Sequence, residues 1–218
     1  MKNSKSIKWR LAQWLEIRWW QQYLQRKEKR SYYQQKATYW QRNLKALSLN
    51  LPPQQSITEV GCGPAGIFIT LSEHQVRAID PLLKQYEQKL AHFSTADYPW
   101  VQFESIPIEE ATGPATDWVF CFNAINHIDD WSRGLDQLDR LCTEQGTIIL
   151  GSDVHKHRFL KWLFRWVPGD ALHPQQHDRQ DYLEALAKRG WVIKKESILK
   201  KGLIFDYWIA SFKKNTVA

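Results

Sequence analysis

The sequence predicts an α/β fold: a seven-stranded, mostly parallel sheet in a three-layer sandwich, with a C-terminal antiparallel hairpin and an N-terminal helical extension. Two observations predict the body of this fold. Short apolar runs alternate with helical stretches beyond residue 55, and the last two runs are joined by little more than a turn. A third observation predicts the extension, because the first 51 residues contain neither proline nor glycine.

Residues 1–50 are expected to form two helices, as a basic, aromatic-rich extension or cap. In the first helix, apolar residues recur every four positions and so share one broad face: Ile7, Leu11, Leu15, Trp19 and Tyr23. The second helix is expected from about Ser31, with Trp40 and Leu44 among its apolar residues. The stretch LPPQQ at 51–55 ends the segment, because proline lacks a backbone donor and restricts the residue before it.

Residues 51–218 are expected to form one domain built on parallel strands. Five apolar runs have the length of strands: Ser56–Val60, Gln75–Ile79, Trp100–Glu104, Trp118–Phe122 and Thr147–Gly151. Three helical stretches lie between them: Gly66–Ser72, Leu82–Phe93 and Asp130–Leu141. A sheet of this kind is covered by helices on both faces and binds ligands at the carboxyl ends of its strands.

The C-terminal end is expected to be antiparallel. Two extended runs, Trp191–Leu199 and Leu203–Phe212, are separated by KKG, with Gly202 as the turn signal. No crossover helix fits between the two runs, so they must pair as a hairpin.

Charge and cysteine content narrow the class of protein. The net charge is +7, but residues 1–50 hold 12 lysine and arginine residues against 2 acidic residues, whereas residues 51–218 hold 18 against 21. The basicity therefore belongs to the extension. Three cysteines without metal-ligand spacing fit a reducing compartment. No apolar run approaches the roughly 18 residues of a membrane span, so a cytoplasmic location is expected.

The stretch EVGCGPAG, from Glu59 to Gly66, has the spacing G-x-G-x-x-G between a strand and a helix. Gly61 allows a tight turn, Gly63 lets a ligand lie against backbone, and Gly66 allows close packing of the following helix. Glu59 would repel a pyrophosphate and favours a cationic ligand, and Asp80 ends the next strand where an acid accepts hydrogen bonds from ribose hydroxyls.

Together these residues resemble the class I S-adenosylmethionine-dependent methyltransferases. The likeness covers residues 54–212 and includes E-x-G-x-G-x-x-G, IDP at 79–81, FCFNAINHIDDW at 120–131 and GTIIL at 146–150. It implies S-adenosylmethionine as cofactor, with the glycine loop along its amino-acid and ribose parts. By this resemblance the cofactor-binding candidates are Glu59, Gly61, Cys62, Gly63, Gly66, Asp80, Pro81, Ile106, Pro107 and Asn123. Nothing marks Cys62 as a nucleophile, and no acidic adenine contact is evident in SIPIEE at 105–110.

The acceptor side is expected after the fourth strand, at Asn123–His127. Relatives that methylate nucleic acid or protein amides often carry N-P-P-[YFW] there, whereas this chain has N-A-I-N and resembles small-molecule enzymes of the ubiquinone and menaquinone type. His127 is a candidate base, a cofactor contact or a cap of the next helix. Residues 153–178 are expected to form a lid, in which Asp170 and His173 are candidate acceptor contacts. A metal at Asp170, His173 and His177 is not expected.

The expected function is methyl transfer to a small acceptor, with quinols, phenols and lipid-like molecules as candidates. Alternatives are RNA or protein methylation, or a non-catalytic cofactor-binding or membrane-associated protein; an NAD-dependent dehydrogenase would leave Glu59 and the hairpin unexplained. The N-terminal helices have three readings: a cap over the active site or a homodimer face, a peripheral contact with an anionic inner membrane surface, or, least favoured, nucleic-acid binding.

Overall fold

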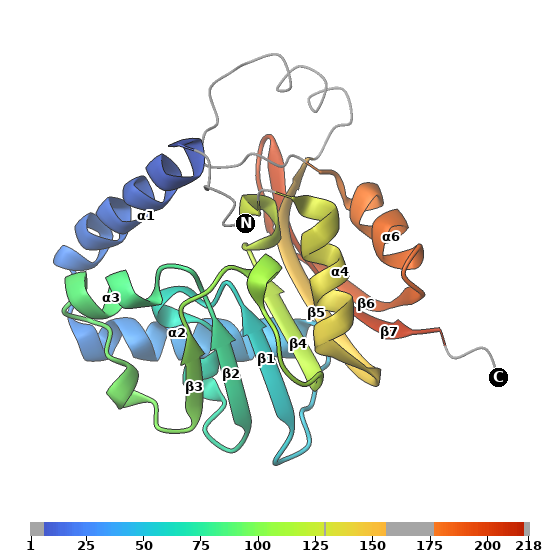
Figure 1. Cartoon of the computed structure of the whole chain (residues 1–218), viewed down its shortest axis with the longest axis horizontal. Coiled ribbons are helices and arrows are strands. Elements are labelled where there is room, and N and C mark those ends of the chain that lie inside the picture. Colours follow the sequence, from blue (N-terminus) through green and yellow to red (C-terminus); the bar gives the residue numbers. More distant parts are fainter. Residues whose placement is uncertain (1–6, 129, 156–176, 216–218) are drawn as a thin grey trace.

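The computed structural model describes residues 7–128, 130–155 and 177–215, and its core is one seven-stranded sheet in the order β3-β2-β1-β4-β5-β7-β6 (Figure 1). The strands are β1 (Ser56–Val60), β2 (Gln75–Ile79), β3 (Val101–Glu104), β4 (Thr116–Phe122), β5 (Cys142–His155), β6 (Trp191–Lys201) and β7 (Phe205–Lys214). β3, β2, β1, β4 and β5 run parallel, whereas β7 is antiparallel to both β5 and β6. The predicted fold class and C-terminal hairpin are confirmed.

The central strands are apolar because helices cover both of their faces. Four consecutive residues of β1, from Ile57 to Val60, are buried, as are the last four of β4, from Val119 to Phe122. The edge strand β6 instead exposes lysines such as Lys194 and Lys195, and charge on an edge discourages pairing with other chains.

The helices are α1 (Ile7–Gln25), α2 (Lys29–Ala46), α3 (Leu83–Lys89), α4 (Trp131–Leu141) and α6 (Arg179–Ala187). The two predicted N-terminal helices are present. The second begins two residues earlier than expected, because the Glu28 carboxylate accepts hydrogen bonds from the backbone N–H groups of Arg30 and Ser31 at 2.8 and 2.6 Å. An acceptor at this position satisfies donors that the helix itself leaves unpaired.

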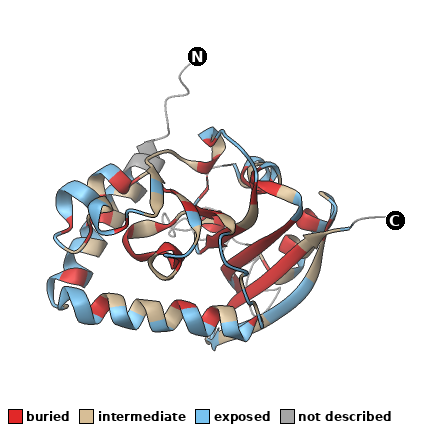
Figure 2. Cartoon of the chain, turned by 90° about the horizontal axis from the view of Figure 1, so that it is seen from below, coloured by how far each residue is buried: buried red, intermediate tan, exposed pale blue. Residues whose placement is uncertain are grey.

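Two hydrophobic cores lie on opposite faces of the sheet. On one face, buried residues of α1, α2 and α3, including Ile17, Trp40 and Tyr86, share a core with Phe120 of β4. On the other face, α4 and α6 pack against the sheet through residues such as Leu135 and Leu186. The outer sides of the helices are exposed, while the strands between them are buried (Figure 2). The N-terminal helices thus supply a covering layer of the sheet.

The expected helix at Gly66–Ser72 is present only as a short 3-10 helix, η2 (Ile67–Thr70), and a second one, η1 (Gly63–Ala65), precedes it. Gly66 has extended backbone and separates them. Two side chains of α2 donate hydrogen bonds to carbonyl groups of η1. The Tyr33 hydroxyl donates to Pro64 O at 3.0 Å, and Trp40 Nε1 donates to Ala65 O at 3.0 Å. Tertiary partners therefore replace the hydrogen bonds of a longer helix.

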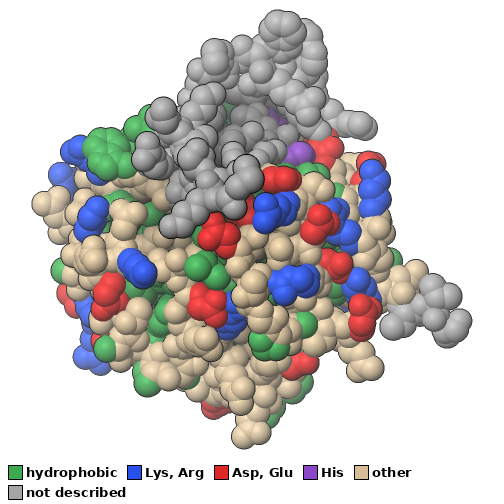
Figure 3. All heavy atoms as spheres, viewed as in Figure 1, with side chains coloured by type: hydrophobic (Ala, Val, Ile, Leu, Met, Phe, Trp, Pro, Cys, Tyr) green, Lys and Arg blue, Asp and Glu red, His purple; other side chains and the backbone are tan. Residues whose placement is uncertain are grey.

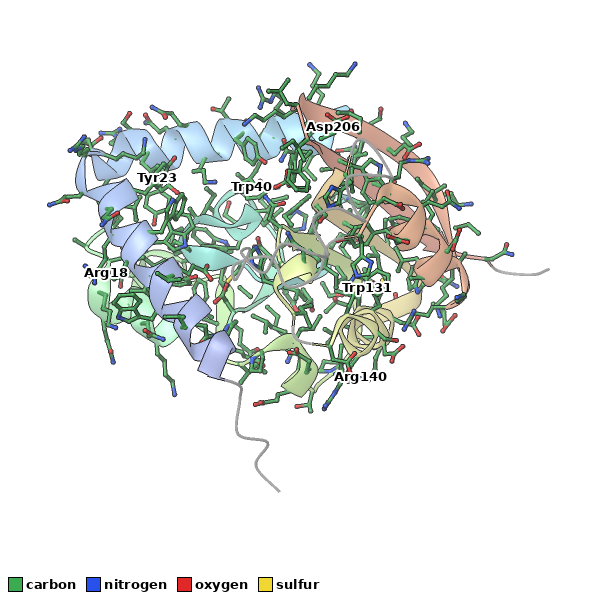
Figure 4. All side chains as sticks on the ribbon, turned by 90° about the horizontal axis from the view of Figure 1, so that it is seen from above. Arg18, Tyr23, Trp40, Trp131, Arg140 and Asp206 are labelled. Atoms are coloured by element: carbon green, nitrogen blue, oxygen red, sulfur yellow. The ribbon has the colours of Figure 1, made fainter. Side chains whose placement is uncertain are left out.

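Trp40 should contribute strongly to stability, because it lies on the sheet side of α2 and packs 4.9 Å, centroid to centroid, from Phe122 (Figure 4). We expect Trp40→Ala to lower the free energy of unfolding by about 3–5 kcal/mol, through the lost burial and the unpaired carbonyl. The matched control is Trp19→Ala, where the ring is 53% exposed and less than about 1 kcal/mol should be lost. Denaturant unfolding measures both free energies. A loss in Trp40→Ala no larger than that in Trp19→Ala would contradict this contribution of Trp40.

Candidate functional site

A hollow opens at the carboxyl ends of β1, β2 and β4. From β1 the chain first adds β2 and β3 on one side and then β4 and β5 on the other, so the direction of strand order reverses between β1 and β4. Ligands of open α/β sheets bind at such a point. Its cavity volume is about 110 Å³. The residues that line it are Glu16, Val60, Gly61, Ile79, Asp80, Pro81, Ile106, Pro107, Ile108, Glu109, Asn123, Ala124, His127 and Ile128.

The glycine turn brings bare backbone to this hollow. Gly61 has a φ of +67°, its N–H donates to Ile79 O at 2.7 Å, and a side chain here would collide with Ala124. Gly63 has a φ of +56°. Both values lie in the left-handed region, where glycine carries no steric penalty.

Glu59 holds the turn from inside the protein and does not line the hollow. Its side chain is buried, and its two carboxylate oxygens accept from the N–H groups of Ile67 and Phe68 at 2.8 and 2.9 Å. A Cβ at Gly66 would collide with this carboxylate, so the small residue makes room for the acid. Burial raises the pKa of Glu59 to about 8, against the opposing effect of the two hydrogen bonds.

Asp80 joins the glycine turn to the end of β2. Its carboxylate accepts from Gly63 N at 2.9 Å and from Leu82 N at 2.8 Å. Burial, and then the nearby carboxyl group of Glu16, raise the pKa of Asp80 to about 7. Because a carboxylate can accept about four hydrogen bonds, Asp80 retains acceptor capacity on the side that lines the hollow.

Glu16 is one of two acids of the hollow, with Glu109, that sequence reasoning missed. It comes from α1 and accepts a hydrogen bond from the Tyr86 hydroxyl at 2.9 Å. Burial raises its pKa above the ordinary value of a glutamate. The available signal was its rarity, since it is one of two acidic residues among the first fifty.

The remaining wall has an apolar part and a polar part. Ile106 and Pro107 follow β3, and Asn123 and His127 follow β4. Asn123 has a φ of +52°, and its N–H donates to Gly151 O at 2.8 Å; a non-glycine residue in this region often marks a functional site. The helix-cap reading of His127 is wrong, because Asp130 caps α4 by accepting from Arg133 N at 3.0 Å.

The structure thus brings seven of the predicted site residues to one hollow: Gly61, Asp80, Pro81, Ile106, Pro107, Asn123 and His127. Four others, Glu59, Cys62, Gly63 and Gly66, belong to the turn behind its lining. Burial raises the pKa of the Cys62 thiol well above its ordinary value, which disfavours a nucleophilic thiolate. Asp170 and His173 lie outside the described residues.

Among the described residues, no cluster of three or more histidine, cysteine, aspartate or glutamate side chains has the arrangement of a metal site. Within the same residues, no helix combines the length and the apolar character that crossing a membrane demands.

The residues present suit a ligand with a nucleoside part. Gly61 presents backbone without a side chain, the Asp80 carboxylate can accept from hydroxyl groups, and Ile106 and Pro107 offer an apolar surface to a ring. The hollow is therefore built for a small polar molecule that carries a flat apolar group.

Comparison with known proteins agrees with this geometry. The family described as "Methyltransferase domain" matches residues 58–148, which hold the glycine turn, Asp80 and His127. No curated protein sequence matches the chain significantly.

Several solved structures share the fold. The magnesium protoporphyrin IX methyltransferase of Synechocystis, with bound S-adenosylhomocysteine, is 19% identical, with a TM-score of 0.57 over 84% of each chain. An N-methyltransferase of Bradyrhizobium japonicum is 13% identical, with a TM-score of 0.59 over 88% of this chain and 90% of that one. A geranyl diphosphate C-methyltransferase of Streptomyces coelicolor is 10% identical, with a TM-score of 0.59 over 82% and 80%. Residues 58–148 match the methyltransferase domain family, and the fold around them is shared with these solved methyltransferases.

Proposed function

We propose that the protein transfers the methyl group of S-adenosylmethionine to a small, hydrophobic acceptor, with quinols, phenols and lipid-like molecules as the first classes to test. One observation carries this proposal: a single hollow is lined by the glycine turn, Asp80, the apolar pair Ile106 and Pro107, and His127. When bound, the cofactor supplies a methyl group already activated on a sulfonium. The protein must then align the acceptor and exclude water.

The cofactor-binding roles follow the walls of the hollow. Gly61 borders the amino-acid and ribose parts with its backbone, Gly63 supports it from behind the lining by donating to Asp80, and Asp80 accepts hydrogen bonds from the ribose. Ile106 and Pro107 pack on the adenine ring, while Pro81 and Asn123 complete the walls on either side. Glu59, Cys62 and Gly66 act from behind the lining, by holding the turn in its conformation.

Two observations support a small acceptor. The stretch after β4 lacks the N-P-P-[YFW] pattern of enzymes that methylate bases and protein amides. In the related structures, the names specify small or medium-sized acceptors, such as geranyl diphosphate and magnesium protoporphyrin IX. No contact of the described residues favours RNA or protein as acceptor over these.

His127 is our candidate for the catalytic base. Its exposed side chain lines the hollow at the carboxyl end of β4, on the side opposite Asp80 along the sheet order. A base is needed only where the acceptor loses a proton, as a phenol or quinol hydroxyl does on O-methylation. For such an acceptor, His127 would remove that proton as the methyl group is transferred.

Residues 51–218 are proposed as the catalytic domain and residues 1–50 as its cap. Support for the cap comes from α1. Glu16 lines the hollow, and the Trp20 ring lies 3.8 Å from the place that a Cβ atom would take at Gly63. The proposed lid, residues 153–178, lies mostly outside the described residues.

The outer face of α1 is proposed to contact an anionic membrane surface, as a peripheral attachment that suits a hydrophobic acceptor. Four large apolar side chains are 40–53% exposed there: Leu11, Trp14, Trp19 and Tyr23. Arg18 lies 4.7 Å above the Trp14 ring and Lys27 lies 4.6 Å above the Tyr23 ring. Figure 3 shows hydrophobic and basic side chains side by side at the upper left, over α1. Aromatic and basic groups together favour a lipid interface.

The ribose contact can be tested by substitution of Asp80. We expect Asp80→Ala to weaken the binding of S-adenosylmethionine and S-adenosylhomocysteine by about 1–3 kcal/mol, through lost hydrogen bonds. The matched control is Asp117→Ala, because Asp117 also binds backbone, at Ser56, but at the opposite end of the strands. Calorimetric titration of folded variants measures the affinities. An unchanged affinity in Asp80→Ala would remove Asp80 from the site.

The role of His127 can be separated from cofactor binding. With an acceptor found in a panel of quinols and phenols, we expect His127→Ala to lower the turnover number by roughly 100-fold or more. The affinity for S-adenosylhomocysteine should change less than two-fold, since the base acts on the acceptor. Transfer of a labelled methyl group measures turnover. Full turnover in the variant would exclude His127 as the base.

Membrane contact predicts co-sedimentation with anionic vesicles at low salt and release at high salt, because charge attraction at a surface is screened by ions. Neutral vesicles should retain less protein, and Trp14→Ala combined with Trp19→Ala should weaken binding to the anionic ones. If the protein stays in solution at low salt, the exposed face of α1 has another role, and sedimentation equilibrium then shows whether it joins two copies.

A further inference from the structure

Resting on the proposed function, we propose that Glu16 is a second carboxylate for the ribose diol of the cofactor and acts together with Asp80. The N-terminal helix α1 would then form one wall of the cofactor site itself, beyond its place as a cover. A residue that binds the cofactor from outside the methyltransferase domain would make residues 1–50 necessary for cofactor binding.

The position of Glu16 is the first support. The buried side of α1 carries Ile17 and Leu24 into the core, and Glu16 lies beside this side with its carboxylate at the hollow. The hydroxyl of Tyr86 donates to Glu16 Oε1 at 2.9 Å, and Tyr86 is itself fully buried in α3. Glu16 is therefore oriented by a donor that cannot move freely.

The packing around Glu16 is the second support. The ring of Trp20, one turn further along α1, meets Tyr86 edge to face at a centroid distance of 6.5 Å. The same ring lies beside Gly63 of the glycine turn. α1 is thus fixed against both α3 and the turn, so its carboxylate keeps a defined place relative to Asp80.

Charge is the third support. The described residues that line the hollow include Glu16, Asp80 and Glu109 but no lysine or arginine. Glu16 raises the pKa of Asp80, as expected for two acids at close range. A ligand that brings hydroxyl donors relieves this mutual repulsion, because each donor stabilises an ionised oxygen. A ribose has two adjacent hydroxyl groups, one for each carboxylate.

Other titratable groups face Asp80 from every side. Cys62 lies on the glycine turn, Glu59 on β1 and Tyr86 on α3; burial, and then the negative charge of Asp80, raise the pKa of each. Glu16, from α1, is the group whose charge raises the pKa of Asp80 itself. Replacement of Glu16 should therefore change the titration of Asp80 as well as the affinity.

The test is calorimetric titration of full-length Glu16→Gln with two ligands, S-adenosylhomocysteine and 5′-methylthioadenosine, which keeps the ribose and lacks the amino-acid part. We expect roughly five- to ten-fold weaker binding of both. The wild-type affinity should rise with pH through about 7 as Asp80 ionises; in Glu16→Gln the midpoint should move to lower pH, because a neighbouring negative charge is gone. The matched control is Gln21→Ala, since Gln21 also joins α1 to α3, at Lys89 O, outside the hollow. It should stay within two-fold.

Several results would overturn the inference. A loss confined to S-adenosylhomocysteine would assign Glu16 to the ammonium group of the amino-acid part. Weaker binding with an unmoved pH midpoint, or a loss equal to that of Gln21→Ala, would mean a structural role only. Unchanged affinity would remove Glu16 from the site. Should Glu16→Gln not fold, Tyr86→Phe removes the orienting donor and is expected to give a smaller loss of both ligands. If the wild type binds neither ligand, the proposed function fails as well.

Discussion

The buried carboxylate of Glu59, which accepts hydrogen bonds from the backbone N–H groups of Ile67 and Phe68, is the contact on which the site depends. It ties the last part of β1 to η2, so the residues between them must form the glycine turn. Gly66 has to be small because the carboxylate occupies the space beside it. An acid buried for this purpose needs both hydrogen bonds, since a buried carboxyl group without partners is strongly destabilising.

The glycine turn is also held from its outer side, by helix α2. Tyr33 and Trp40 donate to the carbonyl groups of Pro64 and Ala65, so two successive peptide groups of η1 are bound by one helix. The turn therefore lies between an acid from the sheet and aromatic donors from the extension. Because α2 also covers the sheet through Trp40, the extension stabilises the core and the turn through the same residues.

Much of the fold could be predicted from sequence, because the strands of β1 to β5 are apolar runs and Gly202 marks the hairpin turn. The helix expected after the glycine turn is only a 3-10 helix, because Gly66 has extended backbone and Glu59 of β1 binds the N–H groups of Ile67 and Phe68. Asp80 and Gly61 could be placed by their motif. Glu16 could not, since its role depends on how α1 packs against Tyr86, 70 residues further along the chain.

The same two acids, Glu59 and Asp80, show how stability and binding are opposed in this site. Their pKa values are raised, to about 8 and about 7, so the folded protein holds protons that the unfolded chain releases above roughly pH 4. Their contribution to stability therefore falls as pH rises from about 4 to 8. Glu59 is satisfied within the protein by two N–H groups and needs no ligand. Asp80 faces the hollow and Glu16, so donors that a ligand brings would stabilise its ionised form further.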